Sequence, residues 1–249
     1  MREIGYLFIG LFLPLFPLSI LFNAVLERIA HPLLRSALLL AWPQVGLLVL
    51  STIAAAPPSW LVIWALATSA LYAFRLLAMR EMGRWTGFLA TSAWALLWLS
   101  ASAGVQPSQL WPFAAAFSAP LAILALLARN LEQRFGAAYT GLYGGLALST
   151  PRLAGVLVIS VMAATATPLF PSFFTMLGTL IVSQPVPAMV LAVVWLIWSW
   201  AAARLLQGLI VGAADPSPDH DLDIGRTWGY TIGLAGLVLA GMILIGSSL

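Results

Sequence analysis

The sequence of 249 residues contains no cysteine and no lysine, and it has few charged residues of any kind. Without cysteine the chain has no disulfide framework, no thiolate metal site and no thiol nucleophile. Only 8% of the residues are charged, whereas 62% are hydrophobic. A soluble domain of this size carries far more charge on its surface. The composition therefore predicts an integral membrane protein with several transmembrane helices.

Ionisable residues are almost absent from the apolar segments, where a proton or cation pathway usually needs them. The acidic residues all fall at segment ends or in connections: Glu3, Glu27, Glu81, Glu132, Asp215, Asp219, Asp221 and Asp223. His31 and His220 lie in separate loops, and neither has a partner at the spacing of a metal site. The sequence also lacks a phosphate-binding loop and a nucleophile elbow. We therefore expect no metal, no cofactor and no catalytic chemistry in this chain.

Eight apolar segments are long enough to cross the core of a bilayer, which takes about 20 helical residues. They cover approximately residues 5–26, 36–56, 60–79, 86–103, 109–128, 153–183, 188–210 and 228–247. We predict an all-α bundle of about eight helices that forms one membrane domain over residues 1–249. The first segment has no small-residue cleavage site and is expected to stay as a membrane helix. The eleven tryptophans are interpreted as interfacial anchors and packing residues.

The sixth segment is too long for one straight crossing, and Pro168 and Pro171 lie near its middle. A proline inside a helix removes a hydrogen-bond donor and costs about 3 kcal/mol. A carbonyl released in this way finds no water within a bilayer. We predict a broken helix with an unwound stretch at Pro168–Pro171. The break can serve packing alone or a polar path, for which Thr165, Thr167 and Ser172 are the candidates.

Ten of the eleven arginines lie in alternate connections on one side of the predicted bundle, and only Arg2 lies on the other. The positive-inside rule places the arginine-rich side in the cytoplasm and both termini outside. We expect a bacterial cytoplasmic (inner) membrane and no nucleic-acid partner. Glu132, Arg134, Arg152 and Arg204 are candidates for docking a soluble partner, and membrane topology alone is the alternative reason for these charges.

Between Ala119 and Gly212 several motifs occur in a fixed order: "NLEQR", "GGL", "PRL", "TPLFP" and "ARLLQGLIVG". Their order and spacing resemble the antiporter-like membrane subunits of respiratory complex I, group 4 membrane hydrogenases and Mrp-type cation/proton antiporters. The resemblance assigns residues 105–249 to an antiporter-like portion and leaves residues 1–104 unassigned. It implies that the broken helix lies at mid-membrane depth, where polar groups line an ion path.

The sequence departs from this family at the residues that carry protons. The family places a lysine or glutamate just after the break, where this chain has Thr175. It commonly has histidine and lysine on the preceding helix, where this chain reads "AAAFSAPLAILALL" and has Pro120. A full-length member has two inverted repeats, and this chain has room for about one repeat and a few extra helices.

The resemblance and its departures imply an accessory, non-pumping subunit of a complex I-related ion-translocating or inorganic-carbon uptake complex. Such a subunit packs beside a larger antiporter-like membrane subunit and can also bind a soluble cytoplasmic subunit. The alternative is an autonomous small transporter that passes a neutral or cationic substrate along hydroxyls and carbonyls. A membrane enzyme is the third reading and has the least support, because no acid/base pair lies at membrane depth.

Overall fold

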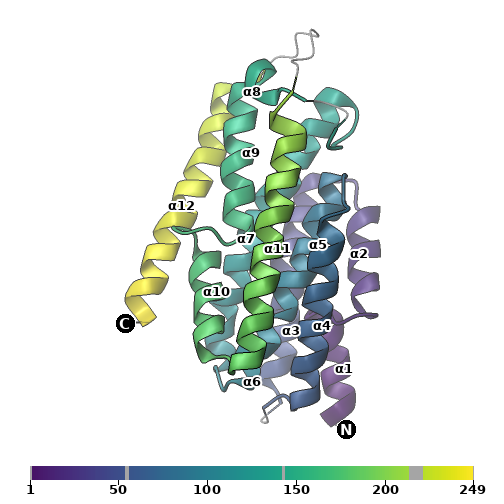
Figure 1. Cartoon of the computed structure of the whole chain (residues 1–249), viewed down its shortest axis with the longest axis vertical. Coiled ribbons are helices and arrows are strands. Elements are labelled where there is room, and N and C mark those ends of the chain that lie inside the picture. The colour runs from purple at the N-terminus through teal and green to yellow at the C-terminus, as the bar shows by residue number, and fades with distance from the viewer. Residues whose placement is uncertain (1, 54–55, 142–143, 213–220, 249) are drawn as a thin grey trace.

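The computed structural model describes residues 2–53, 56–141, 144–212 and 221–248. These residues form a bundle of α-helices, and none of them belongs to a β-strand. The helices lie side by side along the long axis of the molecule (Figure 1). Four of them are long and apolar enough to cross a membrane by themselves: Pro32–Ser51, Ser59–Leu76, Ser108–Phe135 and Pro185–Ile210. The predicted all-α membrane bundle is confirmed.

Five of the predicted segments are single helices. These are α3 (Pro32–Ser51), α4 (Ser59–Leu76), α7 (Pro107–Phe135), α11 (Pro185–Ile210) and α12 (Ile224–Ser248). Proline occupies the first turn of α3, α7 and α11, where its fixed φ suits a helix start and its missing N–H costs nothing. α7 ends at Gly136, whose left-handed conformation terminates the helix.

The other three predicted segments consist of two helices each, so the number of helices exceeds the prediction. The pairs are α1 (Arg2–Phe12) with α2 (Ser19–Arg28), α5 (Met82–Ala95) with α6 (Leu97–Ser102), and α9 (Pro151–Ala164) with α10 (Pro171–Val182). A short helix, α8 (Leu146–Ser149), precedes α9. The α5–α6 interruption contains no proline. It is a local turn in which the Leu96 amide bonds to Ala93 and the Leu99 amide to Leu96.

The centre of the bundle is α5 and the start of α6. Every residue from Trp85 to Ala101 is buried. A helix that is apolar on all sides is stable only when other helices surround it. α5 packs against α2, α4 and α7, and α10 and α11 approach the same region through α6 and α4. The two halves of the chain thus share one core.

The arginine-rich connections meet at one end of the bundle. The Met82 amide donates to Ala138 O at 2.9 Å, and the Thr140 amide donates to Arg80 O at 2.8 Å, so the α4–α5 and α7–α8 connections pair directly. The Gly141 amide bonds to Gly208 O near the end of α11. α1 begins at the opposite end, and α12 runs away from the arginine-rich end to finish beside α10 (Figure 1). The connections that carry ten of the eleven arginines therefore lie at the same end of the bundle, as the sequence predicted.

Candidate functional site

The helix that the sequence predicts to break at Pro168–Pro171 is interrupted there. α9 ends at Ala164 and α10 begins at Pro171. Between them, Ala166 and Leu169 have φ angles of 57° and 84°, in a region that residues other than glycine rarely adopt. The chain leaves the helical path between the two ends of the bundle (Figure 1). The predicted break is confirmed.

The three side chains that were candidates for a polar path cap the end of α9. The Thr165 hydroxyl donates to Val161 O at 2.9 Å, and the Thr167 hydroxyl donates to Met162 O at 2.9 Å. The Ser172 hydroxyl donates to Ala163 O at 2.6 Å. The carbonyls of Val161 and Met162 also accept the backbone amides of Thr165 and Thr167, whereas Ala163 O receives its donor from Ser172. The hydroxyls are therefore directed at the backbone of the break, and Ser172 supplies a donor to a carbonyl in the last turn of α9, where amide donors run out.

Two neighbouring helices close this break between α9 and α10. The indole N–H of Trp195 in α11 reaches Thr165 O at 3.3 Å and Ala166 O at 3.2 Å. On α12, a Cβ added to Gly241 would stand 2.8 Å from Leu169 O. Only glycine allows the helix to pack so closely on the unwound backbone. The break is covered by an indole on one side and by a helix backbone on the other.

Thr175 occupies the position at which the resemblance expects a proton-carrying residue. Its side chain is buried, and its hydroxyl oxygen has no hydrogen-bond partner in the described part of the chain. One turn further, the Thr179 hydroxyl lies 3.0 Å from that of Ser100 in α6. A threonine hydroxyl cannot take up a proton near neutral pH. This position therefore has a polar atom but no group that titrates.

The chain has another break near the N-terminus, where the sequence predicted a continuous helix over residues 5–26. That prediction was wrong, because α1 ends at Phe12 and α2 begins at Ser19. In chain order this is the first break, and the one between α9 and α10 is the second. The residues between them include Pro14-Leu15-Phe16-Pro17, the same tetrapeptide as residues 168–171. The prolines interrupt both helices, but the backbone differs: the Phe16–Pro17 peptide bond is cis, whereas Ala166 and Leu169 have positive φ angles. The repeated "PLFP" was the available signal.

Tryptophan side chains also close the first break. The indole N–H of Trp42 in α3 donates to Leu11 O at 3.1 Å. That of Trp98 in α6 donates to Leu13 O at 3.0 Å, and that of Trp64 in α4 donates to Phe16 O at 2.6 Å. In addition, the Phe16 amide donates to the Thr68 hydroxyl at 3.1 Å. The tryptophan pattern in the sequence indicated anchoring and packing, and it gave no signal for this role.

No charged side chain is buried in the part of the chain that the structure describes. The buried polar residues are serine, threonine and asparagine, and most of them bond to a carbonyl or to each other. Ser69 and Ser92, for example, pair at 3.0 Å, and Trp198 donates to Ser92 at 2.9 Å. Within the described ranges no group of histidine, aspartate and glutamate can hold a metal ion. The interior is polar in places but carries no charge.

The charged residues form a network at the arginine-rich end. Arg84 pairs with Glu27 at 3.2 Å and with Glu81 at 3.1 Å. Glu132 contacts Arg129 at 3.2 Å and Arg35 at 3.8 Å. The first set joins α2 to α5 and the second joins α3 to α7. Because they are partly exposed, each contributes little stability alone.

The four proposed docking residues all lie at this end. Glu132 belongs to the ion-pair network, and Arg134 donates to Asp221 O at 3.3 Å. Arg152 donates through its guanidinium to Leu222 O at 3.2 Å. The Asp221 carboxylate also accepts the first amides of α9, from Arg152 at 2.8 Å and from residue 153 at 3.1 Å. Arg204 is exposed and makes no ion pair with any described residue. Docking through these residues stays a prediction.

Glu81 lies in the connection between α4 and α5, outside the membrane-spanning segments. Partial burial raises the pKa of its carboxyl above the ordinary value, while Arg84 and Arg35 act in the opposite direction. The nearby carboxylates of Glu27 and Glu132 add to the increase in the pKa. Desolvation and the neighbouring carboxylates together thus outweigh the attraction of the two guanidinium groups.

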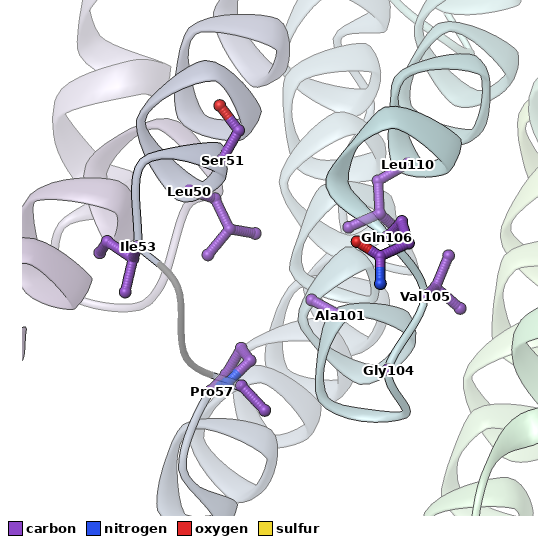
Figure 2. A pocket seen from close by; sticks show the side chains of 10 residues that line it. Leu50, Ser51, Ile53, Pro57, Ala101, Gly104, Val105, Gln106 and Leu110 are labelled. Carbon is purple, nitrogen blue, oxygen red and sulfur yellow. The ribbon is translucent and has the colours of Figure 1, made fainter.

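A cavity of about 310 Å³ opens at the end of the bundle opposite the arginines. Figure 2 shows Leu50, Ser51 and Ile53 at the end of α3 on one side, and Gln106 and Leu110 at the start of α7 on the other. Its lining is uncharged, with Ser51 and Gln106 as the only polar side chains among the lining residues. The cavity offers no charge that would hold an ion.

The chain was compared with protein-family models, with curated proteins and with solved structures. No protein-family model matches the sequence. A protein of uncharacterised function from Aquifex aeolicus (strain VF5) is 22% identical over 239 residues, which cover 94% of this chain and 95% of that protein.

Three solved structures contain chains of similar fold. A chain of the Mrp complex from Dietzia sp. DQ12-45-1b has a TM-score of 0.81 and 14% identity, covering 94% of this chain and 54% of that one. A chain of respiratory complex I from Thermus thermophilus with bound NADH has a TM-score of 0.74 and 21% identity, covering 94% and 52%. A chain of the archaeal membrane-bound sulfane sulfur reductase has a TM-score of 0.81 and 15% identity, covering 96% and 51%.

The chain spans about half the length of these three solved chains. Because the likeness covers at least 94% of this chain, it extends well into residues 1–104, for which the sequence motifs gave no assignment. Together with the confirmed break, it establishes that this integral membrane protein has the fold of the antiporter-like subunits, over about half of their length.

Proposed function

We propose that the chain is an accessory, non-pumping antiporter-like subunit of a complex I-related ion-translocating or inorganic-carbon uptake complex. The observation that carries this proposal is the way in which both helix breaks are closed. Carbonyls released at each break accept hydrogen bonds from tryptophans of neighbouring helices, and hydroxyls cap the second break. A released carbonyl that already has a protein donor is less available to water or to a cation.

The lack of buried charge supports the same proposal. Moving protons or cations through a membrane protein normally requires ionisable groups at membrane depth. The described interior has none, and Thr175 stands where the resemblance expects a lysine or glutamate. In this proposal the chain lies in a bacterial inner membrane beside a full-length proton-channel subunit, with its arginine-rich end in the cytoplasm.

The decisive experiment is extraction of the complex from native membranes in mild detergent, followed by mass spectrometry. We expect a larger antiporter-like membrane subunit to co-purify in a fixed ratio. A solitary protein, or a homo-oligomer of this chain, would overturn the accessory role. In parallel, liposomes that contain this chain alone should show no proton or sodium flux above that of empty liposomes, and a clear flux would contradict the non-pumping role.

A soluble cytoplasmic subunit is the second proposed partner, and Arg204 offers the sharpest test of it. Arg204 is exposed and has no ion pair within the described residues, so its charge is available to a partner. Arg204→Gln should release a soluble subunit at lower salt than the wild type does. Gln207→Ala, on an exposed position of the same helix, is the control and should leave retention unchanged.

The alternative of an autonomous transporter for a neutral substrate has one observation in its favour, the uncharged cavity between α3 and α7. Uptake of labelled neutral solutes by liposomes that contain the purified chain tests this alternative. Uptake that a bulky substitution at Ser51 abolishes would favour it over the accessory role.

A further inference from the structure

A groove of about 530 Å³ runs along the outside of the bundle between α7 and α12 at the arginine-rich end. Its lining residues come from the start of α3, the second half of α7 and the first three turns of α12: Pro32, Leu33, Ile123, Leu126, Arg129, Asn130, Gln133, Arg226, Gly229, Tyr230 and Gly233. Neither the closed helix breaks nor the proposed docking residues account for this groove.

The two ends of the groove differ in chemistry. Its outer end carries Arg129 and Arg226, and no acidic residue lines it. Its inner end is apolar and is formed by Ile123 and two glycines of α12. From Gln133 to Ile123 the wall formed by α7 spans about 15 Å at 1.5 Å per residue. The groove thus begins at the membrane surface and continues into the depth of the acyl chains.

The polar groups at its outer end have unused capacity for an anion. Arg226 is exposed and makes no ion pair with any residue that the structure describes. The Tyr230 hydroxyl accepts a hydrogen bond from the Asn130 amide at 2.8 Å, which leaves its own proton for an acceptor. Arg129 is paired with Glu132 at 3.2 Å but is still 44% exposed.

The glycines of α12 keep the groove open. A Cβ added to Gly229 meets nothing within 4 Å, and one added to Gly233 comes only to 3.9 Å from Ile123. Neither glycine has a positive φ, so a larger side chain is compatible with the helix at both positions. The absence of side chains here makes room for a ligand, since close helix packing does not require it.

We propose that this groove binds one anionic phospholipid, with its phosphate between Arg129, Arg226 and the Tyr230 hydroxyl and an acyl chain along Gly229 and Gly233. Basic pockets between transmembrane helices at the membrane surface suit such headgroups. The positive outer end complements the phosphate charge, and the apolar inner end continues in the direction of the acyl chains. A zwitterionic lipid would bring its own cation near the arginines and gain less.

The test uses native mass spectrometry of the purified full chain after incubation with equimolar phosphatidylglycerol and phosphatidylcholine of identical acyl chains. We expect phosphatidylglycerol to be retained over phosphatidylcholine by roughly tenfold, as two cations near one anionic headgroup predict. Arg226→Gln should lower this ratio several-fold, whereas Arg80→Gln, at an exposed arginine outside the groove, should not change it. Equal retention of both lipids, or equal effects of the two variants, would refute the proposal.

A second pair of variants tests the apolar part. Gly229→Leu fills the groove, while Gly236→Leu adds the same side chain at an exposed, open position of α12 outside it. Only Gly229→Leu should reduce lipid retention, and both variants should elute as the wild type does in size exclusion. Inorganic phosphate at high concentration should not displace the lipid. Full displacement by phosphate would show that the site serves a free anion and would overturn the proposal.

A neighbouring protein is the competing occupant. Because the chain has no cysteine, Gly229→Cys provides a unique attachment point for a short photo-crosslinker in native membranes. We expect adducts with lipid and none with protein. A protein adduct in high yield would assign the groove to a subunit interface instead.

Discussion

Single hydroxyl groups determine how polar the interior of this bundle is. Buried threonines mostly donate to carbonyls of their own helix, as Thr86 and Thr179 do at 2.8 Å, whereas most buried serines bond to a neighbouring helix, as Ser36 does to Ala122 O at 2.9 Å. Such a bond replaces the hydrogen bond to water that a hydroxyl loses inside a membrane. Thr175 is the exception among the described buried threonines, because its hydroxyl oxygen has no partner.

This contrast gives a residue-scale prediction. Thr175→Val keeps the shape of the side chain and removes an uncompensated polar atom, so it should leave stability unchanged or raise it by about 1 kcal/mol. Thr179→Val removes the bond to Ser100 and should lower stability by about 1–3 kcal/mol. Thermal unfolding in detergent, followed by tryptophan fluorescence, measures both variants. A strong loss in Thr175→Val would mean that its hydroxyl has a partner, such as a bound water.

Glu81 provides the second residue-scale prediction, which concerns pH. Its pKa is raised in the folded state, so the neutral carboxyl favours folding. That contribution is complete below the ordinary pKa of 4.5 and is lost as the pH rises through the folded-state pKa. Glu81→Gln stays neutral at every pH. The melting temperature of the variant minus that of the wild type should therefore increase as the pH rises from acidic to neutral.

The size of this effect should stay below about 1 kcal/mol, because water screens a partly exposed carboxyl. Glu3→Gln, at the opposite end of the bundle, is the control. A difference between Glu81→Gln and the wild type that is constant with pH would contradict the raised pKa.

At the scale of elements, the two broken helices are the main departure from regular structure. Each break contains the tetrapeptide Pro-Leu-Phe-Pro, and each is closed by indole donors from neighbouring helices. Tryptophan suits this task because its large ring packs against apolar neighbours while its single N–H satisfies a carbonyl. The breaks are therefore stabilised by tertiary contacts.

Trp195→Phe tests that conclusion. Phenylalanine preserves the ring that packs against Phe173 at 5.5 Å, but it removes the donor to Thr165 O and Ala166 O. We expect a stability loss of about 1–3 kcal/mol and faster hydrogen exchange over residues 165–170. Trp200→Phe is the matched control on α11, since Trp200 is 63% exposed. Equal exchange in the two variants would mean that the indole N–H does not stabilise the break.

The sequence predicted one of these breaks and missed the other for a physical reason. Residues 153–183 are too long for one crossing, so length and prolines together indicated an interruption. Residues 5–26 have the length of one ordinary crossing, so their length gives no sign of a break at Pro14 and Pro17. The indole donors come from helices far away in the sequence, for example Trp98 for Leu13 O, so no local pattern predicts them.

At the scale of the whole molecule, the charge distribution is one-sided. The ion pairs, the Asp221 cap of α9 and the groove between α7 and α12 all lie at the arginine-rich end, while the cavity at the opposite end is uncharged. The chain also has the fold of subunits that work within larger assemblies. The charge distribution therefore predicts that polar contacts with lipid headgroups, and with the soluble partner proposed above, concentrate at one end of the bundle.

The orientation of that surface is the last prediction. Arginine-rich short loops are retained in the cytoplasm during insertion, so the end with ten arginines should face inward. Because the chain lacks cysteine, Ser108→Cys and Tyr139→Cys each introduce a single thiol at an exposed position near opposite ends of α7. A membrane-impermeant maleimide should label Ser108→Cys in intact cells and Tyr139→Cys only after the membrane is opened. The reverse labelling pattern would invert the topology and place the arginines, the groove and any soluble partner outside the cytoplasm.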